Sequence, residues 1–316
     1  MIVEHTATPN SLMKIGVVLP IAEDETPEQI LSYADIRALA LQAEAANFDS
    51  LWIVDHLLFR FPDKPTLGIW EGWTLLTALA EATERVELGS LVLCTAFRNP
   101  ALLAKMAATV DEISGGRLIL GLGAGWHQPE FDAFGLPFDH RVDRFQEALQ
   151  IIVPLLRTGQ VDFNGNYYQA RNCELRPRGP RPDGPQILVG AGRPRMLRLT
   201  ARHADSWNTC WLGQPTALAE RRAALEAACA EEGRDPKTLA VTVGVSITYT
   251  APGETAPTTL DPAKTLSGSP EEIAAALDGY AQLGVAHLTC ALDPFNAQSL
   301  AWLAEAVQHY REHTPK

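Results

Sequence analysis

The order of apolar and amphipathic segments constrains this chain of 316 residues more than any other feature of its sequence. Short apolar runs alternate with longer stretches whose apolar residues recur with the period of a helix. The short runs are typical of buried parallel strands, and the longer stretches are typical of amphipathic helices. The expected strands are Ile15–Leu19, Leu51–Val54, Val86–Leu93, Leu118–Leu122, Ile187–Val189, Asp205–Trp207, Leu239–Ser246 and His287–Cys290. Eight strand–helix units predict an α/β fold, a single (β/α)₈ TIM barrel with loop insertions at its C-terminal mouth.

The helical segments carry recognisable ends. Asn99 can cap a helix that starts at Pro100 and stops at Gly115, and Ser269 with Glu272 has the pattern of a capping box. A proline within the fourth helical segment, Pro154, predicts a kink or an early end. The other expected helices lie around residues 36–43, 75–80, 145–156, 195–203, 215–232 and 297–310.

The main rival fold is a doubly wound open sheet. Such a sheet usually has a glycine-rich turn after its first strand, and Leu19-Pro20-Ile21-Ala22 is not one. We therefore expect one barrel domain over residues 14–316, preceded by a flexible leader over residues 1–13. The long segments Phe59–Gly72, Gln160–Pro185 and Thr248–Gly268 are expected to form loops over the barrel mouth, with a hairpin at Asn164-Gly165.

Composition excludes several classes of partner. The formal net charge is −12 and no basic run occurs, so we expect neither nucleic acid nor an anionic membrane surface as a partner. No apolar stretch is long enough to span a bilayer, and the N-terminal residues lack the pattern of a secretory signal. The five cysteines form no CxxC pair, which predicts buried reduced thiols, no structural metal and a cytoplasmic location.

Candidate chemistry gathers at the predicted C-terminal ends of strands, where barrel active sites lie. Asp55 and His56 follow the second strand, and Cys94 follows the third. An Asp-His pair suits acid–base work or a cofactor contact, because imidazole titrates near neutral pH; the alternative is an ordinary hydrogen-bonded loop histidine. Trp126 and Trp207 follow the fourth and sixth strands, where indole can wall an aromatic ligand or simply pack.

The segment after the fifth strand, Gly190–Arg195, combines glycines, two arginines and a predicted helix start. Glycines let backbone N–H groups approach an anion, and helix N-termini favour negative charge. This pattern predicts a phosphate site; the alternative is a tight turn with solvated arginines.

Two other functional classes are alternatives to a cofactor-dependent redox enzyme. A metal-dependent hydrolase barrel needs a His-x-His after its first strand, and the sequence contains no His-x-His. A barrel that binds a cofactor without turnover fits the same residues. Such a protein would show no absorbance change on addition of substrate.

The residues also resemble a known family, the luciferase-like monooxygenases, which include bacterial luciferase-like and coenzyme F420-dependent oxidoreductases. The resemblance depends on the order and spacing of many blocks along almost the whole chain. They are 48–56, 84–90, 99–105, 111–117, 121–126, Glu130-Phe131, Gly135, Arg141, 187–192, 202–208 and 269–272.

The resemblance implies a flavin-type barrel enzyme that forms a homodimer or a higher homo-oligomer. The tricyclic ring would lie in the barrel mouth, the phosphate would lie near the fifth strand's loop, and a non-prolyl cis peptide would join Leu91 and Val92. The catalytic residues expected on this basis are His56, His127 and Glu130. The expected cofactor-binding residues are Asp55, Leu91, Val92, Cys94, Gly123, Ala124, Gly125, Trp126, Gly190, Ala191, Gly192, Arg193 and Trp207.

The cofactor is either coenzyme F420 or FMN. Asp55-His56 and the Gly-Ala-Gly-Trp segment favour F420, which transfers hydride to or from a small organic substrate; the alternative is an FMN monooxygenase that uses O₂. F420-dependent sugar-phosphate dehydrogenases have a proton-donating glutamate where this chain has Trp126. Sugar-phosphate oxidation is therefore not expected, unless Glu130 or His127 replaces that group. The substrate has no sequence motif.

Overall fold

The computed structural model of the chain describes residues 12–23, 30–251, 261 and 264–313. All but the last two residues of the predicted leader lie outside the described residues. So do most residues of the expected loop over Thr248–Gly268.

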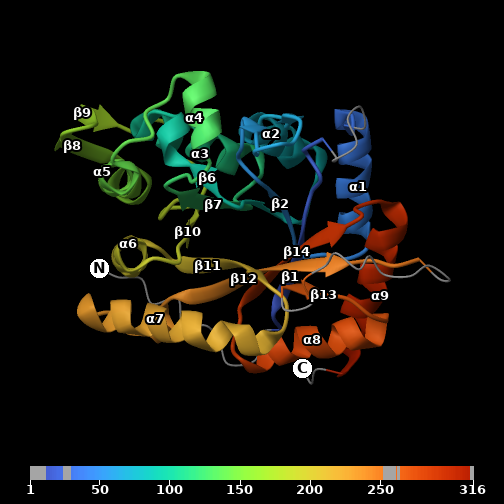
Figure 1. The fold of residues 1–316 in the computed structure, drawn as a ribbon. Helices are drawn as coiled ribbons and strands as arrows, with labels where there is room; N and C mark the ends of the chain where they lie inside the picture. Colours follow the sequence, from blue (N-terminus) through green and yellow to red (C-terminus); the bar gives the residue numbers. More distant parts are fainter. Residues whose placement is uncertain (1–11, 24–29, 252–260, 262–263, 314–316) are drawn as a thin grey trace. The chain divides into compact units, whose positions relative to one another are not determined.

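In the described part of the chain, eight parallel strands are each followed by a helix (Figure 1). The strands are β1 (Lys14–Val18), β2 (Ser50–Ile53), β5 (Glu87–Ser90), β7 (Leu118–Gly123), β10 (Gln186–Gly190), β11 (Ser206–Leu212), β12 (Ala240–Thr248) and β14 (His287–Asp293). The helices are α1 (Tyr33–Ala45), α2 (Gly72–Ala82), α3 (Pro100–Ile113), α5 (Arg141–Thr158), α6 (Pro194–His203), α7 (Leu218–Glu231), α8 (Pro270–Gln282) and α9 (Ala297–His313). This order confirms the predicted (β/α)₈ fold.

Contacts within the chain gather into two compact units. The first unit comprises residues 1–19, 39–52 and 191–316, and the second comprises residues 20–38 and 53–190. Each collects segments that are distant in sequence, as parallel strands joined by helical crossovers require. The expectation of one barrel domain over residues 14–316 stays a prediction.

The first unit contains parallel strands in the order β11, β12, β14, β1 and β2, and the short strand β13 (Thr265–Leu266) pairs with β12. Gly16 of β1 is opposite Ser50 of β2, and a Cβ at Gly16 would lie only 1.9 Å from the Ser50 hydroxyl oxygen. Ser50 is also hydrogen-bonded to buried Trp52 and His287. A polar network therefore occupies this part of an otherwise apolar core.

The second unit holds β5, β7 and β10, with the short strand β6 (Leu93–Cys94) paired to β7. Two antiparallel hairpins accompany these strands. The first joins β3 (Leu58–Phe59) to β4 (Leu67–Gly68), and the second joins β8 (Gln160–Asn164) to β9 (Gln169–Glu174). The second confirms the hairpin predicted at Asn164-Gly165, and the Glu147 carboxylate accepts three backbone N–H groups in its turn.

Helix ends agree with the sequence at several positions. The Asn99 side chain accepts the N–H groups of Ala101 and Leu102, and Ser269 and Glu272 form the predicted capping box. Pro154 neither ends nor shortens its helix, which closes at Gly159 in the left-handed conformation with φ 85°. The missing N–H of Pro154 removes one hydrogen bond, whereas the helix buries most of its apolar face, and the burial decides the outcome.

Several elements differ from the sequence-based expectation. The expected strand Val86–Leu93 is interrupted after Ser90, and β14 continues past Cys290 to Asp293. Strand β11 continues to Leu212, well past the expected end at Trp207, because buried Asn208 donates to the Thr242 hydroxyl and so satisfies its amide inside the sheet. A short helix, α4 (Gln128–Phe134), had not been expected between β7 and α5.

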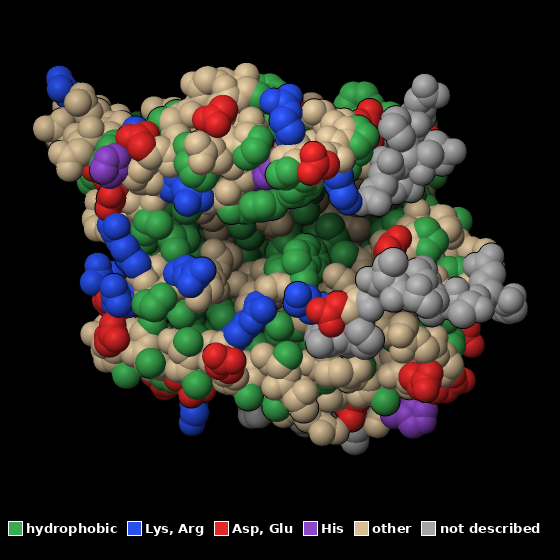
Figure 2. Space-filling model, in the orientation of Figure 1, with side chains coloured by type: hydrophobic (Ala, Val, Ile, Leu, Met, Phe, Trp, Pro, Cys, Tyr) green, Lys and Arg blue, Asp and Glu red, His purple; other side chains and the backbone are tan. Residues whose placement is uncertain are grey.

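The surface shows mixed charge. On the face drawn in Figure 2, Lys and Arg side chains are interspersed with Asp and Glu side chains. Among the described residues, no helix combines the length and the apolar character needed to cross a membrane.

Candidate active site

Asp55, just after β2, lies in a buried ion pair. Its Oδ2 accepts hydrogen bonds from Nη1 of Arg98 at 2.7 Å and from the backbone N–H of Cys94 at 2.8 Å, and its Oδ1 accepts from Nη2 of Arg98 at 2.9 Å. Both carboxylate oxygens are therefore engaged within the protein. These contacts let Asp55 position the segment that ends at Cys94, and contact of Asp55 with a cofactor ring stays a prediction.

Arg98 connects three parts of the second unit. Besides Asp55, its guanidinium donates to the Glu71 carboxylate, which also caps α2 by accepting from Trp73 and Thr74. Burial alone would lower the Arg98 pKa, but the two carboxylates raise it above its usual value. Burial likewise raises the Glu71 pKa, but hydrogen bonds from Thr74 and the charge of Arg98 give a net lowering. Arg98 and Glu71 are thus held in their charged forms.

The predicted cis peptide between Leu91 and Val92 is present. The side chain of Val92 lies against glycines: added Cβ atoms at Gly121, Gly123 and Gly190 would lie 3.2, 2.7 and 3.2 Å from its methyl carbons. Any larger residue at Gly123 would therefore displace Val92. Glycines of β7 and β10 thus leave room for the Val92 side chain, and a cofactor-facing role for this backbone stays a prediction.

Gly125 is required for a second close approach. Its φ is 77°, and a Cβ there would lie 2.6 Å from the Phe131 ring and 2.7 Å from Sγ of Cys94. Nη1 of Arg141 donates to the Gly125 carbonyl at 2.8 Å, which fixes the turn between Ala124 and Trp126. Cys94 itself is buried, and burial, with the charges of Asp55 and Glu130, raises its pKa to about 12. Its thiol is therefore protonated at neutral pH and inert.

His56 and Glu130 form a hydrogen-bonded pair. Nδ1 of His56 lies 3.0 Å from Oε1 and 3.2 Å from Oε2 of Glu130, and the backbone N–H of Leu57 donates to Oε2 at 2.9 Å. The Glu130 side chain is 1% exposed and the His56 side chain 15%. A carboxylate only accepts, so Nδ1 of His56 carries a proton and Nε2 is the nitrogen that can exchange one.

His127 lies in the same cluster but has a different environment. Its Nε2 accepts the backbone N–H of Arg60 at 3.0 Å. Burial lowers its pKa below the usual value, the charge of Glu130 opposes this shift and His56 adds to it. His127 is therefore neutral at pH 7 and its Nε2 is already engaged. Of the three expected catalytic residues, which the structure brings together, His56 and Glu130 are the better placed for proton transfer.

Aromatic rings surround the histidines. The Trp126 ring lies 5.6 Å from the His56 ring and 5.0 Å from the His127 ring, measured between centroids. The Phe59 and Phe61 rings stack 6.1 Å apart and lie 6.0 and 5.1 Å from the His127 ring. Trp126 is 58% exposed and Phe61 is 40% exposed. Trp126, His127, Phe59 and Phe61 are called the aromatic cluster below.

The loop after β10 leads into α6. Arg193 occupies the cap position of α6 without a side-chain cap bond, Pro194 is in the first turn, and a Cβ at Gly192 would meet no atom within 4 Å. Backbone N–H groups at such a helix start are available to an anion. Trp207 is 1% exposed and its Nε1 donates to the Ala191 carbonyl at 2.8 Å. It therefore supports this loop as a packing residue, which was the alternative to a ligand wall.

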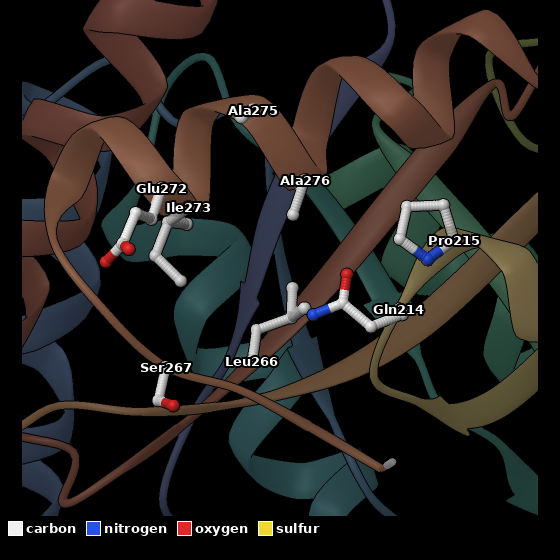
Figure 3. A pocket seen from close by; sticks show the side chains of 8 residues that line it. All are labelled: Gln214, Pro215, Leu266, Ser267, Glu272, Ile273, Ala275 and Ala276. Carbon is white, nitrogen blue, oxygen red and sulfur yellow. The ribbon is translucent and has the colours of Figure 1, made fainter. Parts of the chain in front are cut away.

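A separate pocket of about 340 Å³ lies in the first unit (Figure 3). Figure 3 shows that it is lined by residues of α8 and by the segments around Gln214 and Leu266. None of the predicted site residues lines it. Among the described residues, no group of three or more His, Cys, Asp or Glu side chains could hold a metal ion.

Sequence reasoning assigned no role to Arg98, Glu71, Phe59 and Phe61. Arg98 follows a short 3-10 turn after β6, and nothing local in the sequence pairs it with Asp55. Phe59 and Phe61 alternate in the segment after β2, a pattern typical of one exposed face, but nothing local pairs them with His127.

The family model described as luciferase-like monooxygenase matches residues 13–264. This chain belongs to the luciferase-like monooxygenase family. The chain is 35% identical over 248 residues to the pyrimidine monooxygenase RutA of Methylobacterium radiotolerans, a match that covers 72% of this chain and 63% of that protein. It is 32% identical over 244 residues to RutA of Cronobacter turicensis, covering 71% and 62%. The chain thus spans less than two thirds of the length of these relatives.

Solved structures of similar fold include an F420-dependent dehydrogenase and a monooxygenase. An F420-dependent secondary alcohol dehydrogenase has a TM-score of 0.77 and 19% identity, over 95% of this chain and 100% of that chain. The monooxygenase RslO1 from Streptomyces bottropensis has a TM-score of 0.73 and 22% identity, over 95% and 98%. At these identities the likeness shows the fold of the family and leaves the cofactor open.

Proposed function

We propose that this chain is an FMN-dependent monooxygenase that uses reduced flavin and O₂ to oxidise a small organic substrate. The sequence analysis had put F420-dependent hydride transfer first and FMN chemistry second. We place FMN chemistry first because the relatives at 32% and 35% identity are named monooxygenases. The F420-dependent enzymes support only the fold, at 19% identity.

The residues present fit a flavin-type cofactor. A flavin phosphate needs backbone donors and positive charge, which the uncapped start of α6 with Arg193 and Arg195 can supply. The ring needs a close backbone surface, which the glycine-supported segment at Val92 and the turn at Gly125 can supply. Ala191 and Gly192 form the loop before α6, and Trp207 supports that loop through its hydrogen bond to the Ala191 carbonyl.

Reduced flavin, when bound, supplies the two electrons needed for reaction with O₂. The residues of this chain would provide the environment. Glu130 orients His56 through Nδ1, so that Nε2 of His56 takes up or returns a proton. The Asp55–Arg98 pair holds the backbone N–H of Cys94 and, with it, the segment containing Val92.

The observation that carries the proposal is the His56–Glu130 pair beside exposed Trp126, in a chain whose relatives at above 30% identity are named monooxygenases. The test incubates the purified chain separately with FMN and with F420, removes free cofactor by gel filtration and measures the retained fluorescence. Reduced FMN is then supplied by a flavin reductase with O₂ and with uracil as the first substrate, and oxygenated product is measured by mass spectrometry.

Retention of FMN in preference to F420 would support the proposal, and product gaining one oxygen atom from ¹⁸O₂ would support it further. Retention of F420 alone would contradict it and return F420-dependent hydride transfer to first place. An Arg193→Ala, Arg195→Ala double variant should bind FMN about ten- to hundredfold more weakly, because charge-assisted contacts to the phosphate are lost. Unchanged affinity would place the phosphate elsewhere.

A further inference from the structure

A second tryptophan, Trp211, lies beyond Trp207 at the C-terminal end of β11. The sequence predicted a strand end at Trp207, but β11 continues to Leu212. Trp211 is therefore the tryptophan of this strand that reaches the end where barrel active sites lie. Its side chain is 39% exposed, whereas Trp207 is buried. The Trp211 indole N–H makes no hydrogen bond to another described residue.

A β-bulge sets the direction of the Trp211 ring. The register of β11 against β12 shifts between Thr209 and Leu212. Two residues, Cys210 and Trp211, therefore lie opposite Gly244 alone. A Cβ at Gly244 would lie 2.6 Å from Sγ of Cys210 and 3.3 Å from the Trp211 ring. In a regular strand consecutive side chains point to opposite faces, but this bulge brings two to one face, as bulges at barrel rims and beside active sites do.

Contacts with α7 show which face of β11 carries these two side chains. Nη1 of Arg221 on α7 donates to the Thr209 hydroxyl at 2.6 Å, so Thr209 faces the helices. Asn208 precedes Thr209 and faces the barrel interior, and its Oδ1 accepts from the Cys210 thiol at 2.9 Å. Arg221 also donates to the Cys210 carbonyl, which holds the bulge in place. Trp211 therefore lies on the interior face in a fixed position.

The interior face of β12 carries small side chains and one hydroxyl without a partner. Gly244, Ser246 and Thr248 alternate along this strand, and Ala291 of β14 lies beside Ser246 in the register. Small side chains here leave room for a ligand beside the Trp211 ring. Thr248 is 3% exposed, and its hydroxyl has no hydrogen-bond partner among the described residues. Buried hydroxyl groups are nearly always hydrogen-bonded, so this one points to a ligand group.

We propose that Trp211 and Thr248 are two further contacts of the flavin-type cofactor. The tricyclic ring packs against the Trp211 indole, and its polar edge accepts a hydrogen bond from the Thr248 hydroxyl. Flat aromatic rings pack favourably against indole. The inference rests on the proposed function, because it assigns contacts of the cofactor of that site. Both residues belong to the first unit, whereas the aromatic cluster belongs to the second.

The first experiment measures FMN affinity by fluorescence titration for Trp211→Leu and Trp211→Phe. Trp211→Leu should bind FMN about tenfold more weakly because the flat ring is lost, and Trp211→Phe should lose less because it keeps a ring. Far-ultraviolet circular dichroism checks that each variant is folded. Parental FMN affinity in folded Trp211→Leu would overturn the role of Trp211.

Leu283→Ala is the matched control for the loss of an exposed apolar side chain. Leu283 is 38% exposed in the same unit, but it follows α8 just before β14 begins, at the opposite end of the strands. It should bind FMN as the parent does. A loss in Leu283→Ala equal to that in Trp211→Leu would show a general effect of the substitutions and would refute the contact.

Thr248→Val gives two readouts that move in opposite directions, because valine keeps the shape of threonine without its hydroxyl. The melting temperature of the cofactor-free chain should rise, since an unpaired buried polar group is removed, and FMN should bind about two- to tenfold more weakly. Thr242→Val is the control. The Thr242 hydroxyl is bonded to Asn208 and to the Trp207 carbonyl, so its loss should lower the melting temperature. Parental FMN affinity in Thr248→Val would remove Thr248 from the cofactor site.

The same titrations with F420 separate the possible failures. If the parent retains F420 and not FMN, the proposed FMN function fails, but weaker F420 binding by Trp211→Leu and Thr248→Val supports the inference. If the parent binds FMN and both variants bind it equally well, the proposed function stands and the inference is wrong. If the parent binds neither cofactor, both are wrong.

Discussion

The buried carboxylate of Glu130 lies 3.0 Å from Nδ1 of His56 and fixes which ring nitrogen of that histidine faces outward. The two residues are 74 positions apart, on the loop after β2 and on α4. The contact gives His56 one tautomer and one orientation, as an acid–base residue needs.

Glu130→Gln should lower turnover with reduced FMN and O₂ by about ten- to hundredfold. An amide can donate as well as accept, so Nδ1 of His56 would no longer be the required donor and the wrong tautomer would become populated. The measurement is steady-state oxygen consumption against pH for parent and variant. A uniform loss of folded protein would leave the shape of the pH profile unchanged, whereas the positioning role predicts a shifted profile. An unshifted profile with parental turnover would remove Glu130 from the mechanism.

Breaking the Asp55–Arg98 pair should destabilise the fold. Arg98→Ala leaves the buried carboxylate of Asp55 with one backbone partner, and the free energy of unfolding should fall by about 3–5 kcal/mol. The measurement is urea unfolding followed by circular dichroism. Arg198→Ala is the control, because the side chains of Arg198 and its partner Glu231 are 38% and 59% exposed, and the loss of stability should be much smaller. Equal stability of Arg98→Ala and parent would mean that the pair contributes nothing to the segment at Cys94.

Stability should fall as the solution is acidified, and His287 is a main cause. Burial lowers the His287 pKa to about 3, and Lys14 adds to the shift. The unfolded chain takes up a proton near pH 6.5 but the folded chain does not, so stability is fully present above about pH 6.5 and is lost towards pH 3. The loss from this one group is about 1.4 kcal/mol per pH unit below pH 6.5.

Urea unfolding of the parent and of His287→Gln at pH 7.0, 6.0 and 5.0 isolates this contribution. His127 and His203 also have lowered pKa values and act in the same direction, so both proteins should lose stability on acidification. The slope of His287→Gln should be the shallower of the two. Identical slopes would show that His287 does not remain neutral in the fold.

Local sequence signals predicted the fold better than the site. The ends of α3 agree with the Asn99-Pro100 start, and the capping box at Ser269 is present, because both depend on residues a few positions apart. The continuation of β11 to Leu212 was missed, because it depends on the hydrogen bond between Asn208 and Thr242, 34 positions away.

The site was predicted as a set of strand-end residues, and that set includes the His56–Glu130–His127 group. The partners were not predictable. Asp55 forms an ion pair with Arg98, 43 positions away, and no spacing rule predicts this pairing. Trp207 and Trp126 have the same residue type at equivalent strand ends, yet one is buried and the other exposed, because burial depends on what packs over each ring.

We propose that FMN binds beside His56 and that His56 handles the proton of the redox step. The most direct test is stopped-flow reoxidation of the chain loaded with reduced FMN, on mixing with O₂, for the parent and for His56→Ala. For His56→Ala we expect FMN affinity within about threefold of the parent and a reoxidation rate lower by about a hundredfold, the usual scale of a lost acid–base group. A parental rate in His56→Ala, with FMN fully bound, would contradict it.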